Sequence, residues 1–205
     1  MKVVIVGVGT TAMIVADILL ESHNFKLAGY VGTKKEEEHL KRSKIYHGVP
    51  FLGDHSILKS LKKGDITGFV VAIGDNHIRE KVYYEAMQAD LIPVNAVSRK
   101  AIINSDVELG KGVVVSPGVV LSHGVTIGSN VILDPSVIVH VQSTVSDHCY
   151  LFAGVVVCGR CYLEKNVTVE AGAVVQTGVK IGKNNRIEAG RVVRKNVAGK
   201  YRNKG

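Results

Sequence analysis

The sequence predicts two structural classes in one chain: a small α/β domain over residues 1–97 and an all-β domain, a parallel β-helix, over residues 98–205. Two observations carry this prediction. The chain opens with an apolar strand, a glycine-rich turn and a helical stretch, the order found in nucleotide-binding α/β units. From Ala101 onward an aliphatic residue recurs every six residues without a slip, a period that suits neither a helix nor a hairpin.

The first domain begins with a buried strand at 2–6, followed by the turn Gly7-Val-Gly-Thr-Thr-Ala12 and a helix through about Ser22. This G-x-G-x-x-A spacing lets a phosphate approach the backbone at the positive end of a helix. Further strands are expected at 27–31, 68–73 and 91–94, and a further helix at about 77–88. The domain is too short for a complete NAD fold, and residues 32–35 lack the acid expected after the second strand. We therefore expect a Rossmann-like unit, with a purely structural turn as the alternative.

The second domain is predicted by sixteen successive hexads, from Ile103 to Val193, that carry an aliphatic residue at one phase. Two residues earlier stands a second small or apolar residue, with three exceptions: Ser143, Asn185 and Arg191. Each hexad would form one flat side, and three sides would form one coil of 18 residues, giving about five coils. The corners are expected to need unusual backbone angles, which glycine tolerates, at Gly110, Gly128 and Gly182.

Composition restricts the classes of protein. Hydrophobic residues make up 46% and charged residues 21%, which is typical of a globular protein and argues against disorder. The apolar stretch from Val3 to Leu20 is interrupted by glycines and Asp17, so we expect neither a membrane span nor a signal peptide. Three cysteines fit a reducing cytoplasm, and Cys161 of the Cys158-x-x-Cys161 pair falls on the inward phase, as a buried small hydrophobe would.

The positive charge has a location. Residues 180–205 hold nine Lys and Arg against one Glu, which equals the net charge of +8 for the whole chain. A solubilising tail and a phosphate-binding site both remain open. Nucleic acid is not expected as a partner, because only Tyr201 interleaves with these charges and no stacking platform is present.

Segments such as Val125-Thr-Ile-Gly-Ser-Asn130 and Val179-Lys-Ile-Gly-Lys-Asn184 resemble the hexapeptide-repeat acyltransferases, which have a left-handed β-helix. The combination with a small Rossmann-like domain resembles, more narrowly, the sialic acid O-acetyltransferase-like family. That family includes N-acetyltransferases of nucleotide-linked amino sugars in bacterial surface-glycan synthesis. The anchors of the resemblance are the opening Val-Ile-Val-Gly-Val-Gly, Gly29-Tyr-Val, Gly48-Val-Pro-Phe-Leu-Gly53 and the segment 71–79.

The resemblance implies a cytoplasmic homotrimer that transfers an acetyl group from acetyl-CoA to a sugar amine by direct attack, with a histidine as general base. Two alternatives stay open: O-acetylation of sialic acid or a related sugar, and a non-catalytic relative that binds a sugar nucleotide. The resemblance carries the sugar-nucleotide-binding roles to two loops: Gly7, Gly9, Thr10, Thr11, Gly74, Asp75 and Asn76.

The position of the base is open. In the family it lies in an acid-His-acid motif, and the matching residue here is Val141, next to His140. His140 could serve after a local bulge, or His123 could serve, since it lies 18 residues before Val141 and therefore one coil below. A third possibility is that the base is absent. Asp134 matches a family Asn near the catalytic histidine and could orient an imidazole.

The resemblance also places CoA along the later coils. Its phosphates would attract the basic side chains there, namely Arg186, Arg191, Arg194 and Lys195. The chain ends without the closing Gly-x-Pro-Ala segment of the family, so we expect a shortened loop near CoA. No metal is expected, because His123, His140 and His148 lack the short paired spacing of a zinc site.

Overall fold

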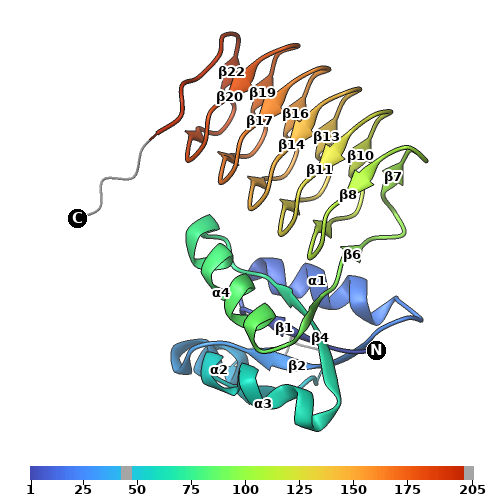
Figure 1. Ribbon diagram of the computed structural model, residues 1–205, viewed down its shortest axis with the longest axis vertical. Coiled ribbons are helices and arrows are strands. Elements are labelled where there is room, and N and C mark those ends of the chain that lie inside the picture. Colours follow the sequence, from blue (N-terminus) through green and yellow to red (C-terminus); the bar gives the residue numbers. More distant parts are fainter. Residues whose placement is uncertain (43–47, 201–205) are drawn as a thin grey trace. The chain divides into compact units, whose positions relative to one another are not determined.

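The computed structural model describes residues 1–42 and 48–200, with the backbone alone for 39–42. Tyr201 and the last two of the nine basic residues, Arg202 and Lys204, lie outside the described part. The chain divides into two compact units, Met1–Ala96 and Val97–Gly205 (Figure 1). Neither unit has, within its described residues, a helix of the length and apolarity needed to span a membrane.

The first unit is a parallel five-stranded sheet in the order β3-β2-β1-β4-β5. Its strands are β1 (Lys2–Val6), β2 (Lys26–Val31), β3 (Phe51–Gly53), β4 (Ile66–Val71) and β5 (Ile92–Pro93). Its helices are α1 (Thr10–Leu20), α2 (Lys34–Arg42), α3 (Leu58–Leu61) and α4 (Asn76–Gln88), with two 3₁₀ turns beside α3, η1 (His55–Ile57) and η2 (Lys62–Gly64). The predicted strands and both predicted helices are present, whereas β3, α2 and α3 had not been predicted.

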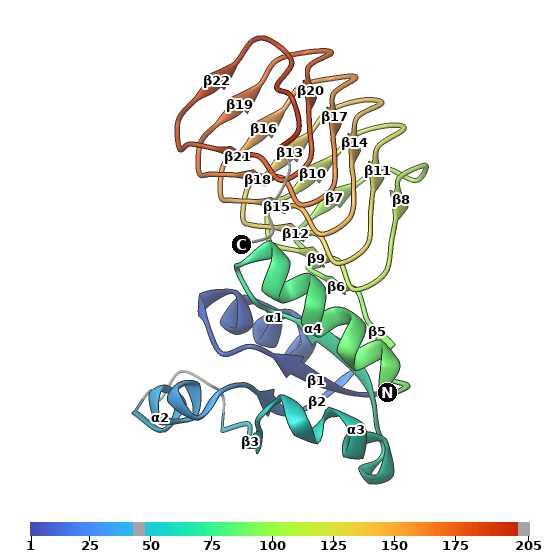
Figure 2. The same cartoon turned by 60° about the vertical axis from the view of Figure 1, so that its left-hand side comes forward.

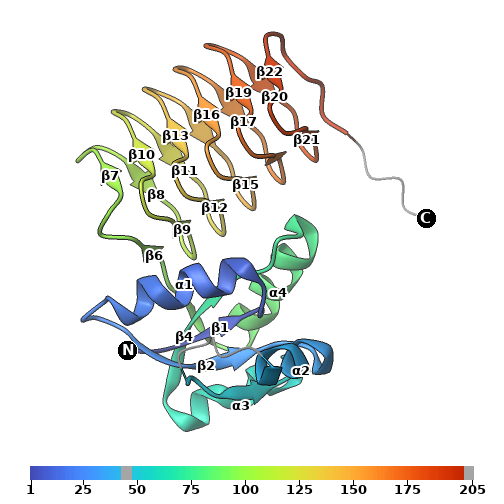
Figure 3. The same ribbon diagram turned by 180° about the vertical axis from the view of Figure 1, so that it is seen from behind.

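Near-continuous apolar runs build this sheet because helices cover both of its faces. Alternate residues of β1 and β4, such as Val4 and Phe69, pack with Leu58 of α3 and Val82 of α4 in one buried cluster. The helix α1 lies over β1 and β2 (Figure 3). The sheet is therefore a rigid support for the loops that follow its strands.

The strand order reverses between β1 and β4, and this is the place where parallel α/β sheets bind ligands, at the carboxyl ends of the strands. The glycine turn follows β1, and the Gly74–Asn76 loop follows β4. Gly7 has a φ of +113°, and a Cβ there would lie 2.6 Å from the carbonyl oxygen of Ala72. Only glycine fits where these two loops meet.

The second unit is a left-handed parallel β-helix built from two-residue strands. They form three flat sheets in the orders β22-β19-β16-β13-β10-β7, β20-β17-β14-β11-β8 and β21-β18-β15-β12-β9-β6 (Figure 2). In chain order the strands are β6 (Ala96–Val97), β7 (Ile102–Ile103), β8 (Glu108–Leu109), β9 (Val114–Val115), β10 (Val120–Leu121), β11 (Thr126–Ile127), β12 (Ile132–Leu133), β13 (Ile138–Val139), β14 (Thr144–Val145), β15 (Tyr150–Leu151), β16 (Val156–Val157), β17 (Tyr162–Leu163), β18 (Thr168–Val169), β19 (Val174–Val175), β20 (Lys180–Ile181), β21 (Arg186–Ile187) and β22 (Val192–Val193).

Each strand pairs with the strand 18 residues further along, as in Ile138↔Val156, which confirms the predicted coil length. The inward aliphatic residues form one continuous buried cluster along the helix. Two of the polar exceptions are satisfied inside it. Ser143 donates to the carbonyl of Cys158 at 2.8 Å, and Asn185 donates to the carbonyls of Gly182 and Ala198 at 2.8 and 2.7 Å. The third, Arg191, is exposed.

The prediction that Gly110, Gly128 and Gly182 have the unusual backbone angles of the corners was wrong, because these angles occur at another position of the hexad. The left-handed residue of each corner lies three positions after the aliphatic residue, not one, and it recurs every six residues from Gly112 to Gly190. Half of these positions are not glycine: Asn130, Ser136, Gln142, His148, Arg160, Asn166 and Asn184. Gly110 and Gly128 are required for a different reason. A Cβ at Gly128 would lie 2.6 Å from the backbone nitrogen of Asp147 on the next coil.

We predict that Gly128→Ala lowers the free energy of unfolding by about 2 kcal/mol, because the added methyl group overpacks against fixed backbone. The matched control is Gly172→Asn, since Gly172 has a left-handed φ of +67° with open space around it, and Asn already occupies that phase elsewhere. Urea unfolding of both variants checks this prediction. Equal midpoints for the two variants would contradict it.

Candidate active site

The candidate site lies along one edge of the β-helix, at the corner that follows β13. This edge, called here the histidine edge, consists of residues 122–125, 140–143, 158–161, 176–179 and 194–197, which stack on successive coils. His123, Val141 and Lys195 share one column of the stack, whereas His140 and Arg194 share the neighbouring column. Successive coils are about 4.8 Å apart, as hydrogen-bonded strands are.

His123 has a carboxylate partner that the sequence did not reveal. Its Nδ1 lies 3.1 Å from Oδ1 of Asp106, and the backbone N–H of Gly124 donates to Oδ2 of the same carboxylate at 2.9 Å. Burial raises the pKa of Asp106, but the hydrogen bonds from Gly124 and His123 outweigh it, so the pKa is lowered overall. Asp106 was missed because its relation to His123 and Gly124 appears only when residues 18 apart are aligned.

His140 is exposed, and its backbone stays in the regular ladder. Its N–H donates to the carbonyl of Val157 at 2.8 Å, and Gln142 N–H donates to the carbonyl of His123 at 2.9 Å. The coil therefore has no bulge at this point, and His140 does not move into the place of Val141. Among the residues that the structure describes, the His140 imidazole has no hydrogen-bond or ion-pair partner.

Asp134 lies at a different corner, after β12, and not on the histidine edge. It accepts a hydrogen bond from the Tyr150 hydroxyl at 3.0 Å, and the Tyr150 ring stacks on Phe152 with 4.1 Å between centroids. Burial raises the pKa of the Asp134 carboxyl, and the Tyr150 hydrogen bond lowers it by less. Within one chain the observed partner of Asp134 is thus a tyrosine, whereas the imidazole of His123 is oriented by Asp106.

The four basic residues predicted to hold CoA separate into two groups. Arg194 and Lys195 lie on the histidine edge, are exposed, and have no acidic partner among the described residues. Arg186 lies in β21, on a different face of the β-helix, and its guanidinium is paired with the Glu170 carboxylate. Arg191 is exposed and lies outside the histidine edge. Among the described residues, the edge therefore carries three exposed cations without an acidic partner: Arg160, one coil beyond His140, and Arg194 and Lys195, three and four coils beyond His140 and His123.

The first unit brings its two predicted binding loops together at the ends of β1 and β4. The helix α1 has Gly9 as N-cap with no side-chain cap, so the N–H groups of its first turn, which includes Thr10 and Thr11, face a possible anion. Thr11 is buried, whereas Gly9 has no heavy atom within 4 Å of where a Cβ would stand. The glycine turn thus leaves room for a ligand.

In the second loop, Gly74–Asn76, the side chains of Asp75 and Asn76 make hydrogen bonds within the protein. The Asp75 carboxylate caps α4 by accepting from the N–H groups of His77 and Ile78, both at 2.9 Å. The Asn76 side chain accepts from the fully buried Arg79 at 2.7 Å, and Arg79 also donates to the carbonyl of Ile73 at 2.9 Å. These bonds fix the loop, so Gly74–Asn76 would meet a ligand mainly through backbone groups.

A carboxylate does follow β2, at Glu36, but it belongs to the start of α2 and does not replace the missing acid. Glu36 accepts from the N–H of Thr33 at 2.6 Å, and Thr33 Oγ1 accepts from the N–H of Glu36 at 3.3 Å, which is a capping box at the start of α2. Because Glu36 also fills the space beside Gly32, this carboxylate is committed to the helix.

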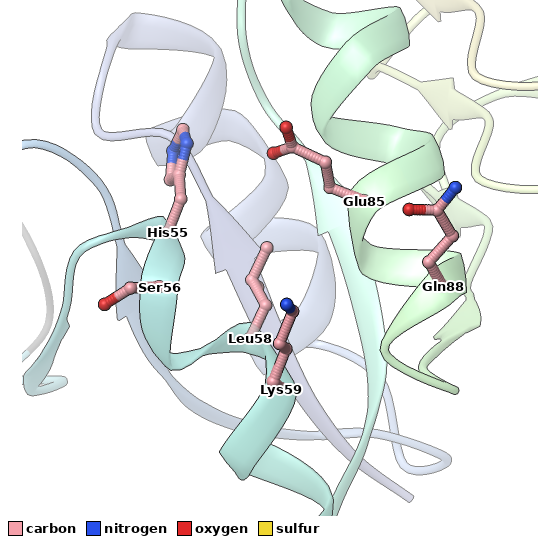
Figure 4. Close-up of a pocket in the computed structure, with 6 residues that line it drawn as sticks. All are labelled: His55, Ser56, Leu58, Lys59, Glu85 and Gln88. Carbon is pink, nitrogen blue, oxygen red and sulfur yellow. The ribbon is translucent and has the colours of Figure 1, made fainter.

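The remaining candidate features are a cavity in the first unit and two buried side chains of the second unit, His148 and Cys161. A cavity of about 370 Å³ in the first unit is lined by His55, Ser56, Leu58, Lys59, Glu85 and Gln88 (Figure 4). Glu85 stands about 14 Å along α4 from the start of the helix at the glycine loops. His148 is buried, with its Nδ1 2.8 Å from the Asn130 amide, and Cys161 is buried as predicted. The described residues contain no cluster of three or more His, Cys, Asp or Glu that could hold a metal ion.

The chain is similar to known proteins over both of its units. Residues 2–86 match the family model of the PglD N-terminal domain. Perosamine N-acetyltransferase from Caulobacter crescentus, with one histidine replaced by asparagine and with CoA and GDP-perosamine bound, is similar at 28% identity, with a TM-score of 0.89, over 97% of this chain and 91% of that chain. PerB from the same organism, with CoA and GDP-perosamine, gives the same score and identity over 98% of this chain and 92% of that chain.

The acetyltransferase domain of PglB from Neisseria gonorrhoeae FA1090 shares the fold, with a TM-score of 0.64 at 20% identity over 96% of this chain and 92% of that chain. No curated protein matches the chain. The fold and these similarities support an acetyl-CoA-dependent sugar acetyltransferase with hexapeptide repeats. Within that class the chain carries the PglD type of N-terminal domain, which confirms the resemblance inferred from the sequence.

We predict that Asp134→Asn stabilises the protein at pH 7. The raised pKa means that the folded state holds the proton more tightly than the unfolded state, so the stability from Asp134 is present at low pH and lost as pH rises through the folded pKa. An asparagine side chain stays neutral, so it avoids this loss of stability at high pH. Its oxygen still accepts the hydrogen bond from the Tyr150 hydroxyl. Thermal melts of both proteins from pH 4 to pH 8 should show a higher Tm for the variant at pH 7 and a difference that shrinks toward pH 4. A constant difference across this range would contradict the assignment.

Proposed function

We propose that this protein is an acetyl-CoA-dependent N-acetyltransferase of a nucleotide-linked amino sugar. One observation carries the proposal: Arg194 and Lys195, which have no acidic partner in the described part of the chain, share columns of the β-helix with the two exposed histidines of the edge, His140 and His123. Arg194 stands three coil spacings from His140, about 14 Å. An extended pantetheine arm spans such a distance between the phosphates of CoA and its thioester.

The edge between these ends is suited to a long, thin ligand. The intermediate coils carry the small residues Gly159, Thr177 and Gly178, with open space around Gly178, and also the polar side chains of Arg160 and Gln176. CoA would lie along this edge, with its phosphates at Arg194 and Lys195 and its thioester near Val141. A homotrimer would place a neighbouring β-helix opposite the edge and form the cleft that a thioester needs for protection from water.

The reaction is direct transfer. The unprotonated sugar amine attacks the thioester carbonyl, the N–C bond forms, and the C–S bond breaks. A histidine accepts the proton that the amine loses and returns it to the departing thiolate. The carbonyl oxygen gains negative charge during the attack and is stabilised by a hydrogen-bond donor such as a backbone N–H.

The first unit, residues 1–97, would bind the nucleotide part of the acceptor, and residues 98–205 would hold CoA and the reacting groups. The phosphates fit the uncapped first turn of α1 at Gly9 and Thr10, with Gly7 allowing close approach. The Gly74–Asn76 loop would contribute backbone groups. The GDP-perosamine held by the Caulobacter crescentus enzyme makes a GDP-linked amino sugar the first acceptor to test. We place the reaction in the cytoplasm, in bacterial surface-glycan synthesis.

A non-catalytic sugar-nucleotide-binding relative is the second candidate, and one observation favours it. Val141 occupies the place where the family carries its histidine, and its side chain is exposed, so the usual base is missing there. If the protein is an enzyme, the alternative activity is O-acetylation of sialic acid or a related sugar. The acceptor panel below distinguishes this activity from N-acetylation of a nucleotide-linked amino sugar.

The expected result for the proposed function is release of CoA thiol from acetyl-CoA that depends on an amino-sugar nucleotide. The panel contains GDP-perosamine, UDP- and TDP-linked amino sugars, and sialic acid, with mass spectrometry to identify an N-acetyl product. Val141→His should raise the rate if the family's base position is still productive. Acetyl-CoA and acceptor binding without release, in the wild type and in Val141→His, would favour the non-catalytic relative.

We predict that the double variant Arg194→Ala with Lys195→Ala weakens acetyl-CoA binding by about tenfold to a hundredfold, because each exposed cation contributes a charge-assisted contact of about 1 kcal/mol. The matched control is Arg186→Ala, in which a paired arginine on another face is removed. Isothermal titration calorimetry with acetyl-CoA measures the effect. Equal losses in the control and in the double variant would place CoA elsewhere.

A further inference from the structure

We propose that the general base of this protein is His123, held by Asp106 as its positioning residue, and that His140 is not the base. The inference rests on the proposed function and assigns its central catalytic residue. The chain has thus kept a base on the histidine edge, one coil below the place that Val141 occupies.

The hydrogen-bond chemistry of the pair selects the reactive nitrogen. An ionised carboxylate only accepts hydrogen bonds, so the contact of 3.1 Å between Asp106 Oδ1 and His123 Nδ1 places the proton on Nδ1. The lone pair of the neutral ring is then on Nε2, which is the form that accepts a proton. The same logic positions the histidine in catalytic triads, where the carboxylate fixes the tautomer and the ring orientation.

The carboxylate is itself held in place. Its second oxygen accepts from the Gly124 N–H at 2.9 Å, so both oxygens bridge to consecutive residues of the next coil. This double contact fixes Asp106 relative to His123 even though the two side chains are half or more exposed, at 51% and 72%. By contrast, His140 has no partner that would choose its tautomer among the described residues.

The position also suits the acceptor. His123 belongs to the column of Val141 and Lys195, so it faces the same line along the edge that CoA would follow. One coil spacing of about 4.8 Å separates its backbone from that of Val141, a gap that an imidazole or one bridging water covers. Nε2 takes the proton released as the N–C bond forms, and the imidazolium returns it to the CoA thiolate when the C–S bond breaks. Asp106 stays ionised throughout.

The kinetic test compares single variants under saturating acetyl-CoA. His123→Ala should lower kcat by about a hundredfold or more, the usual contribution of a general base, with the KM for acetyl-CoA nearly unchanged. Added imidazole should restore part of that rate. Asp106→Asn should lower kcat by about tenfold, again without a change in KM. His140→Ala should lower kcat by much less than His123→Ala does, because the exposed His140 imidazole takes no part in the proton transfer.

The control for Asp106→Asn is Asp147→Asn. Asp147 is also an exposed carboxylate that accepts a coil-to-coil bond, from the Ser129 N–H at 2.6 Å, but it contacts no histidine in the described structure. If both Asp variants lose the same activity, the role of Asp106 is structural and the inference fails. If His140→Ala loses activity while His123→Ala keeps it, the base has been misassigned.

A measurement without turnover separates this inference from the proposed function. In nitrogen-15 NMR of wild-type protein, the His123 ring should appear as the Nδ1–H tautomer, and its signals should shift when acetyl-CoA is added. Asp106→Asn should abolish that tautomer preference. A ring that shows the Nε2–H tautomer and no response to acetyl-CoA overturns the inference, even if the enzyme is active. Absence of CoA release with every acceptor, despite a responsive His123, overturns the proposed acceptor class and leaves the pair at the CoA site.

Discussion

The second unit depends on one constraint, the constant offset of 18 residues between paired strands. Every pairing in its three sheets obeys this offset, and a slip of one residue would turn the inward aliphatic residues toward water. The offset also aligns the polar side chains, since residues 18 apart stack in columns along each edge. A catalytic group and a phosphate-binding group can therefore be far apart in sequence and still share a straight line. His123 and Lys195, four coils apart, are the pair to which we assign these two roles.

Much of this architecture could be predicted because it is periodic. Sixteen hexads in phase determine the coil, and the apolar strand before Gly7 determines the start of the sheet. The missed elements are short or polar: β3 has three residues, α3 has four, and α2 is almost entirely charged. The corner phase was misassigned because Asn, Gln, His and Arg occupy left-handed positions that glycine was expected to mark. Composition alone does not reveal backbone angles that several polar residues tolerate.

The candidate site was harder to predict than the fold. Sequence similarity pointed to the place of Val141. The two histidines near it, His140 next to it in the chain and His123 one coil below, could not be ranked from spacing. The contact between Asp106 and His123 separates them, and it depends on the exact course of two neighbouring coils. In the first unit the sequence predicted more binding side chains than the structure leaves available, because the loops predicted to bind a ligand are partly committed to structure. Asp75 caps a helix and Asn76 holds the buried Arg79, so recognition there shifts from side chains to backbone.

The open end of the β-helix has a consequence for motion. Each inner coil is paired on both sides, whereas β22 pairs only with β19. Within the described chain, residues 196–200 bond back to the preceding coil, as in the Val197 N–H to the Lys180 carbonyl and the Asn185 amide to the Ala198 carbonyl. In stacked repeats the terminal unit opens first, at a free energy below that of global unfolding. Arg194 and Lys195 stand on this fraying coil. A ligand that contacts these two side chains and the inner coils at once would raise the free energy needed to open the last coil. Amide hydrogen exchange in that coil would therefore slow when the ligand binds.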